Sequence, residues 1–250
     1  MNGLRLALSW LTVLPVAGPD TVGRRLAAAA IRWSPVVGLL LGGLAAGVLC
    51  VGVLAGLPPL LAGLLTVAAL ALATRGMHLD GLADTVDGLG CFGPPERALV
   101  VMRDGGAGPF AVVTLVLVLG AQVAAFGALA AAPRGWAAVV LATVVGRVSF
   151  LWCCRSGVPA ARPDGLGALV ADSQRWWAAT LGWLAAVVLA AFAVPGRPWQ
   201  GPLAVVLAAS LVIGLSAHTR RRFGGVTGDV LGAATELATT TVIGVLAAGR

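Results

Sequence analysis

HLDGLADTVDG, from His78 to Gly88, is the most informative stretch of this chain. It spaces Asp80, Asp84 and Asp87 at i, i+4 and i+7, so a helix here carries all three carboxylates within a narrow sector of one face. Like charges at that spacing repel one another unless they share a cation. Because an apolar run precedes the stretch, we expect a hard-cation site of oxygen ligands at the end of a membrane span.

The composition around this stretch is that of an integral membrane protein. Of the 250 residues, 59% are hydrophobic and only 11% are charged, whereas soluble domains have about 25% charged residues. The 35 glycines suit close packing of helices in lipid. We therefore predict an all-α, polytopic helix bundle that forms a single transmembrane catalytic domain over residues 1–250.

Seven apolar stretches are long enough to predict membrane spans. The N-terminal residues 1–16 combine a short apolar run with one arginine and lack a small-residue cleavage site. They predict an amphipathic interfacial helix or a re-entrant segment rather than a signal peptide. The predicted spans are roughly 34–55, 60–77, 109–131, 136–154, 176–194, 200–217 and 230–248.

The arginines predict the orientation. Alternate loops place 13 arginines on one side, against Arg134, Arg197 and Arg250 on the other, with Arg147 inside a span. The positive-inside rule makes the arginine-rich side of this multi-pass protein cytoplasmic. The 13 are Arg5, Arg24, Arg25, Arg32, Arg75, Arg97, Arg103, Arg155, Arg162, Arg175, Arg220, Arg221 and Arg222.

The charges also narrow the class of function. Nine of the ten acidic residues lie on the arginine-rich side, whereas a channel or transporter needs polar groups along a whole path. The net charge of +7 comes wholly from arginine and indicates an anionic lipid surface or a phosphate-bearing substrate, not nucleic acid. The four cysteines form no CxxC pair, which disfavours zinc and redox sites. An enzyme at the cytoplasmic membrane surface fits best.

A fourth carboxylate, Asp104, follows the first three and precedes a glycine-rich turn at 105–109. If two helices meet at this turn, Asp104 reaches the same ion. Mg²⁺ takes one or two carboxylates per ion together with waters and phosphate oxygens, so four carboxylates could hold two ions for phosphoryl chemistry. The alternative is a solvated acidic face at the membrane interface.

A second polar segment, RRRFGGVTGD at 220–229, precedes the last span, which contains Glu236. Asp229 and Glu236 are seven residues apart and share one helix face. The glycines allow backbone N–H groups to approach an anion at a helix start, although Thr227 or Asp229 could equally be a plain N-cap.

Two further residues are candidates for the site. An intramembrane arginine needs a partner, so we predict that Arg147 lies near Asp229 and Glu236 or near the first acidic cluster; the alternative is snorkelling to the interface. His78 could be a ligand or a general base, and is otherwise an ordinary helix-end residue.

Several motifs together closely resemble one enzyme family. They are HLDGLADTVDG at 78–88, MRD at 102–104, and GGVTGDVLGA at 224–233 with Glu236 and Leu237. With LTVLPV at 11–16 and PVVG at 35–38, they resemble the cobalamin synthases (adenosylcobinamide-GDP ribazoletransferases) over essentially the whole chain. The resemblance implies a polytopic inner-membrane enzyme that joins activated cobinamide to α-ribazole or its 5′-phosphate, releases GMP and needs Mg²⁺.

The resemblance and the carboxylates together predict the roles of individual residues. Mg²⁺ held by Asp80, Asp84, Asp87 and Asp104 bridges the diphosphate, with Asp104 and Asp87 as the catalytic carboxylates and Asp104 as the general base. The residues expected to bind substrate are His78, Arg103, Arg147, Thr227, Asp229 and Glu236.

Two other functions remain as alternatives. The spacing Asp84-x-x-Asp87-Gly88 weakly resembles a motif of the CDP-alcohol phosphotransferases. Intramembrane carboxylates would also serve a cation-coupled transporter. The sequence leaves open whether the chain forms a homo-oligomer.

Overall fold

The computed structural model describes residues 2–19, 21–132 and 134–248, and its regular secondary structure is helical apart from two isolated β-bridges. Asp20 and Arg250 lie outside the described residues. The helices are α1 (Asn2–Leu11), α2 (Arg24–Leu54), α3 (Pro59–Ala73), α4 (Met77–Gly90), α5 (Pro95–Val101), α6 (Pro109–Ala130), α7 (Gly135–Cys153), α8 (Gly165–Val170), α9 (Trp176–Ala190), α10 (Gln200–Phe223) and α11 (Gly228–Ala247).

Five of these helices, α2, α6, α7, α10 and α11, are long and apolar enough to cross a membrane. The all-α, multi-pass architecture is thereby confirmed. The described chain has five such helices, or six if the bent pair α3–α4 counts as one span, where the sequence predicted seven. The difference arises because α3 and α9 have 15 residues each. At about 1.5 Å per residue they extend about 22 Å, less than the roughly 30 Å of a hydrocarbon core.

The bend between α3 and α4 separates the aspartates from the spans. Arg75 and Gly76 both have positive φ, 55° and 68°, and Gly76 is the N-cap of α4. The two helices consequently meet at 89°. Helix α4, which carries the aspartates, therefore runs nearly perpendicular to α3 and lies outside the five spans.

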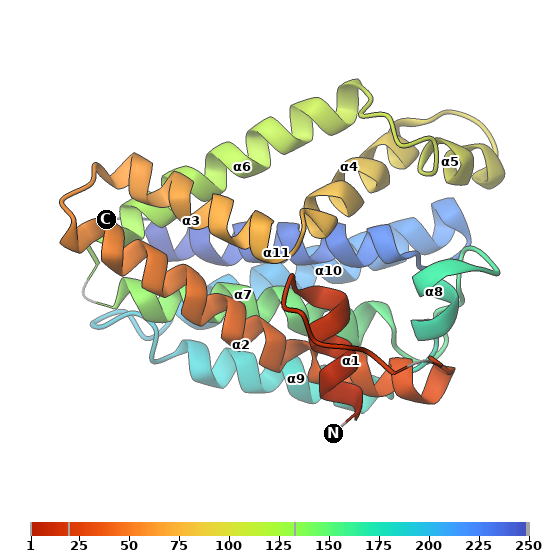
Figure 1. Ribbon diagram of the computed structural model, residues 1–250, viewed down its shortest axis with the longest axis horizontal. Coiled ribbons are helices and arrows are strands. Elements are labelled where there is room, and N and C mark those ends of the chain that lie inside the picture. Colours follow the sequence, from red (N-terminus) through yellow and green to blue (C-terminus); the bar gives the residue numbers. More distant parts are fainter. Residues whose placement is uncertain (1, 20, 133, 249–250) are drawn as a thin grey trace.

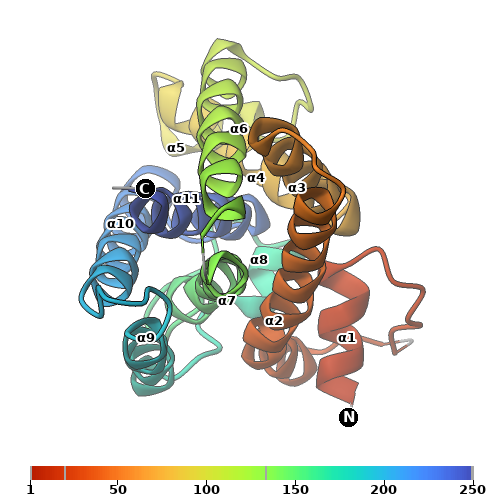
Figure 2. The same cartoon turned by 90° about the vertical axis from the view of Figure 1, so that its left-hand side faces the viewer.

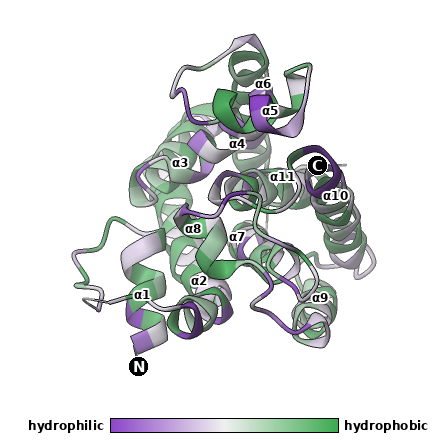
Figure 3. Cartoon of the chain, turned by 90° about the vertical axis from the view of Figure 1, so that its right-hand side faces the viewer, coloured by the Kyte–Doolittle hydropathy of each residue, from purple (hydrophilic) through white to green (hydrophobic). Residues whose placement is uncertain are grey.

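The helices divide the molecule into two unlike ends (Figure 1). At one end lie α5, α8, the C-terminal part of α4 and the turn between α10 and α11. At the other end are the short connections α2–α3, α6–α7 and α9–α10, seen from the front in Figure 2. Figure 3 looks onto the first end, where hydrophilic segments gather around α4, α5 and α8. The longer connections of the chain thus share one end of the bundle.

Helix α7 lies inside the bundle between α2 and α11 (Figure 2), its two most extensive neighbours. Glycines on α2 allow the close approach: a Cβ at Gly38 would lie 2.8 Å from the Thr143 carbonyl oxygen, and one at Gly42 would lie 2.8 Å from the Val140 Cα. Small residues thus bring helix backbones together, as expected for packing in lipid. The short amphipathic helix α1 packs on α2.

Candidate active site

Two glycines bring α4 against α11. A Cβ at Gly81 would lie 2.7 Å from the carbonyl oxygen of Asp229, and one at Gly232 would lie 3.0 Å from the carbonyl oxygen of His78. Only glycine permits backbones to approach so closely. This crossing joins the two motifs singled out in the sequence, although about 150 residues of chain separate them.

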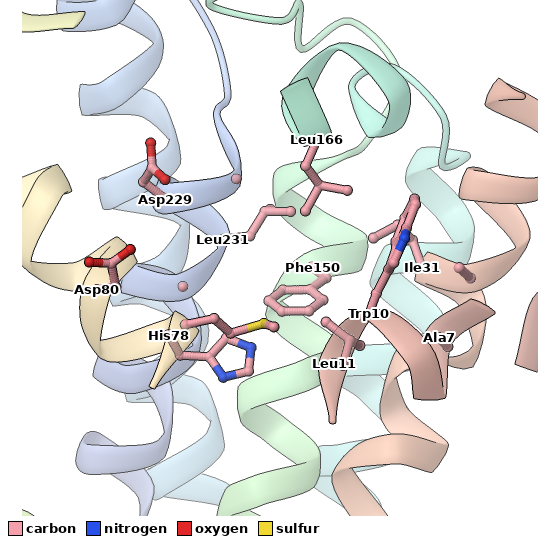
Figure 4. Close-up of a pocket in the computed structure, with 14 residues that line it drawn as sticks. Ala7, Trp10, Leu11, Ile31, His78, Asp80, Phe150, Leu166, Asp229 and Leu231 are labelled. Atoms are coloured by element: carbon pink, nitrogen blue, oxygen red, sulfur yellow. The ribbon is translucent and has the colours of Figure 1, made fainter. Parts of the chain in front are cut away.

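The crossing gathers acidic side chains from both helices. Figure 4 shows Asp80 on α4 beside Asp229 on α11. Asp84, one turn beyond Asp80, is half-buried, and its pKa is raised to about 6 by burial and then by the Asp80 and Asp229 carboxylates, against the opposing effect of Arg162. Burial is thus the main cause of the raised pKa of Asp84, and the two neighbouring carboxylates add to it.

Asp87 is engaged differently. It is 8% exposed, and its two carboxylate oxygens accept hydrogen bonds from the backbone N–H groups of Gly108, at 2.6 Å, and Ala111, at 2.9 Å. It thus caps the start of α6 from a neighbouring helix and attaches α6 to α4. The metal-binding and catalytic roles predicted for Asp87 remain predictions beside this structural one.

The segment after α5 lies apart from the cluster. Asp104 is exposed, and within the described chain its carboxylate has no hydrogen bond or ion pair. Arg103 forms an exposed ion pair with Asp164 at 2.5 Å. The glycine-rich turn does lead into α6, but Asp87 is the carboxylate that meets it.

The four-carboxylate cage expected from the sequence is not assembled. Among residues 2–19, 21–132 and 134–248, no group of three or more His, Cys, Asp or Glu side chains is arranged to hold one metal ion. Asp80 and Asp84 remain near each other, Asp87 is turned to α6, and Asp104 is exposed elsewhere. Asp229 lies beside Asp80 where α11 crosses α4, whereas Asp104 follows α5 and is exposed, so the metal-binding and catalytic roles predicted for Asp104 remain predictions.

Arg162 is a site residue that sequence reasoning missed. Its Nη1 lies 3.7 Å from the Asp229 Oδ2, and its Nη2 donates to the Leu99 carbonyl oxygen at 2.9 Å. A parallel β-bridge between Ala160 and Val226 holds its loop against the turn before α11. In the sequence Arg162 is one more arginine on the arginine-rich side, so no local signal distinguishes it.

The glycine-rich turn before α11 is shaped by packing. Gly224 ends α10 with φ 81°, and a side chain at Gly225 would strike the Pro159 backbone. The Thr227 hydroxyl accepts a hydrogen bond from the Val230 N–H at 3.3 Å. Thr227 is therefore the N-cap of α11, which is the plainer of the two interpretations that the sequence allowed.

A buried polar cluster lies behind the carboxylates. Arg147 is 3% exposed, which contradicts the snorkelling alternative. Its Nη2 lies 3.4 Å from the His78 Nδ1, and with Glu236 it lines a cavity of about 20 Å³, enough for one water. Glu236 accepts a hydrogen bond from the Gln122 Nε2 at 2.8 Å, and the same nitrogen donates to Thr240 at 3.0 Å. The prediction that Arg147 lies near the Glu236 face is confirmed.

A larger cavity of about 280 Å³ opens beside the acidic residues, between α1, α2, α4, α7, α8 and α11 (Figure 4). His78, Asp80 and Asp229 line it on the side of the helix crossing. Its larger apolar side chains are Trp10, Leu11, Ile31, Met77, Phe150, Leu166 and Leu231.

Residues 3–247 match the model of the family described as cobalamin-5-phosphate synthase. The chain belongs to this family. Three relatives carry the name adenosylcobinamide-GDP ribazoletransferase. That of Frankia casuarinae is 39% identical over 97% of this chain and 93% of its own length. The relative from a Nocardioides species is 43% identical over 94% of this chain and 93% of its own length. The relative from Corynebacterium efficiens is 37% identical over 96% of this chain and 89% of its own length. No solved structure matches the chain significantly.

Membership of the cobalamin-5-phosphate synthase family confirms the resemblance drawn from the motifs. It makes the chain an enzyme of cobalamin biosynthesis and decides against the lipid-type phosphotransferase and the transporter.

Proposed function

We propose that this chain transfers the cobinamide phosphate of adenosylcobinamide-GDP to α-ribazole or its 5′-phosphate and releases GMP. The observation that carries the proposal is the family match over residues 3–247, which includes both helices of the acidic crossing. The arginine distribution supports a bacterial inner-membrane location with the reacting end in the cytoplasm.

The residues at the crossing fit Mg²⁺. Asp80 and Asp84 would hold the ion, because Mg²⁺ is usually bound by one or two carboxylates together with waters and substrate phosphates, and no cage of protein ligands is needed. A cation bound beside Asp84 would lower its pKa, which burial and then the Asp80 and Asp229 carboxylates raise. When bound, the ion supplies positive charge against the diphosphate.

The chain's own groups surround the reacting phosphorus. A nucleoside hydroxyl forms the new P–O bond, the bond to the bridging oxygen of the diphosphate breaks, and GMP leaves with that oxygen. Arg162, which is ion-paired with Asp229, would bind phosphate oxygens, and Arg103, which acts more weakly on Asp229, would do so from the segment after α5. Asp229 accepts the hydroxyl proton, because it lines the cavity beside the cluster while Asp104 stands apart.

The test is a reconstitution of the reaction. Purified protein in detergent is incubated with adenosylcobinamide-GDP, α-ribazole and Mg²⁺, and GMP and the corrinoid product are quantified by liquid chromatography and mass spectrometry. We expect GMP and product in equal amounts and neither when the nucleoside or Mg²⁺ is omitted. GMP formed without the nucleoside would indicate a hydrolase, and no GMP from folded protein would refute the transfer.

A further inference from the structure

One nitrogen of His78 lacks a partner at the edge of the 280 Å³ cavity. The side chain is 3% exposed and lines the cavity on α4, where Figure 4 shows its ring beside Leu11 and Phe150. Its Nε2 is buried and has no hydrogen-bond partner among the residues that the structure describes. A buried polar atom without a partner destabilises the protein, so it calls for an explanation.

The contact with Arg147 defines what this nitrogen offers. A guanidinium can only donate, so the His78 Nδ1, 3.4 Å from the Arg147 Nη2, is the acceptor of that pair. The neutral ring then carries its proton on Nε2. Because Nδ1 is turned to Arg147 in the core, the Nε2–H edge is left for the cavity. The cavity is thus lined by this buried ring donor and by the Trp10 indole N–H, among walls that are otherwise mostly apolar on that side.

The walls restrict the shape of the ligand. They come from the aromatic rings of Trp10 and Phe150 and from the aliphatic side chains of Leu11, Ile31 and Leu231. Aromatic and aliphatic side chains of this kind bind flat, apolar rings, and 280 Å³ is near the lower end of the sizes of ligand pockets, about 300–1,000 Å³. Such a space suits a bicyclic heteroaromatic ring and is too small for a corrinoid.

We propose that this cavity binds the heteroaromatic base of the nucleoside substrate, with the His78 Nε2–H donating to its unsubstituted ring nitrogen. The sugar then lies toward Asp80 and Asp229, which line the same cavity at the helix crossing. This assignment rests on the proposed transferase function and adds to it a specificity site. It makes His78 and the cavity wall the selectors for planar bases with one bare ring nitrogen, as in an N-glycosylated benzimidazole.

The hydrogen bond is tested by binding alone, without Mg²⁺ or corrinoid. Isothermal titration of the purified protein compares a benzimidazole riboside with the matching indole riboside, in which a C–H group replaces the bare ring nitrogen. We expect the wild type to prefer the benzimidazole riboside about tenfold, the effect of one well-made hydrogen bond. In His78→Phe, which keeps a ring but loses the donor, the preference should vanish. Equal affinities in the wild type would overturn the proposal.

The cavity wall provides a second test that leaves His78 and Arg147 intact. Leu166→Trp fills the cavity from α8, whereas Leu169→Trp adds the same bulk to the same helix away from the cavity lining. We expect riboside binding to fall at least tenfold in the first variant and to stay near wild type in the second. Unchanged binding in folded Leu166→Trp would contradict the assignment, whatever the fate of His78→Phe.

The same protein is also assayed for GMP release. If the protein releases GMP but binds both ribosides equally, the assignment of the cavity to the base is wrong and the proposed transferase function stands. If the protein prefers the benzimidazole riboside but releases no GMP, the assignment of the cavity stands and the proposed transferase function is wrong. The two failures are therefore distinguishable.

Discussion

The pKa of Asp84 depends on burial and on the neighbouring carboxylates at the helix crossing. This pKa is raised from the usual 3.8 to about 6, so folding favours the protonated form. This contribution to stability is fully present at low pH and is lost as pH rises through about 6. We therefore predict that the wild type loses stability relative to Asp84→Asn between about pH 4 and pH 6, measured as the midpoint of thermal unfolding in detergent.

Mg²⁺ should reverse this penalty above pH 6. We expect added Mg²⁺ to raise the unfolding midpoint of the wild type and not that of Asp84→Asn. We also expect the turnover of Asp84→Asn to fall at least about 100-fold, because the variant lacks a charge that faces the metal. An equal Mg²⁺ effect in both proteins would place the ion elsewhere.

Asp87 should respond differently from its neighbour. An asparagine keeps one acceptor oxygen and places an N–H₂ group where the second backbone donor of α6 now points. We predict that Asp87→Asn lowers the free energy of unfolding by about 1–3 kcal/mol, as chemical denaturation would show. Native stability with abolished turnover would instead favour the metal-ligand role predicted from the sequence.

Glu236 is the nearby acidic group for the buried Arg147, and its side chain is already hydrogen-bonded to Gln122. Glu236→Gln removes a buried charge that acts on Arg147 without a direct ion pair among the described residues, and it sets a second amide against Gln122, which we expect to cost about 1–3 kcal/mol. We predict that Glu236→Gln unfolds at lower temperature but keeps near-normal turnover per folded molecule. A folded variant with weak substrate binding would instead support the substrate-binding role that the sequence suggested for Glu236.

At the scale of elements, the function depends on the α4–α11 crossing. Gly81→Ala would place a Cβ against the Asp229 backbone and push the helices apart, and overpacking of this kind costs about 1–3 kcal/mol. We expect lower stability and at least about tenfold lower turnover, because Asp80 and Asp84 move away from Asp229. The matched control is Gly244→Ala on α11, where a Cβ meets nothing within 4 Å. An active Gly81→Ala would mean that the close crossing is dispensable.

For the whole molecule, the predicted orientation is tested by cysteine labelling. Phe92 is 90% exposed at the polar end, and Arg197 is exposed in the α9–α10 connection at the other end (Figure 1). After replacement of the natural cysteines, a membrane-impermeant maleimide should label Arg197→Cys in intact spheroplasts and Phe92→Cys only after permeabilisation. Labelling of Phe92→Cys from outside would reverse the orientation.

Local patterns in the sequence determined much of this protein. Apolar runs predicted a multi-pass helix bundle, because the membrane admits few other structures. The spacing of Asp80, Asp84 and Asp87 was interpreted as a helix within 78–88, and α4 is a helix over Met77–Gly90. The motifs predicted the family, which is confirmed. The need of a buried arginine for a partner placed Arg147 near Glu236, since that cost is the same in any fold.

Only the tertiary structure decided which carboxylates come together. Asp80 and Asp229 line one cavity because two glycines let distant helices touch, whereas Asp87 is drawn to the start of α6. Arg162 joins them through a loop with no distinguishing sequence pattern. Helical periodicity specifies which residues share a face, but the neighbour of that face is set by packing between segments far apart in the chain.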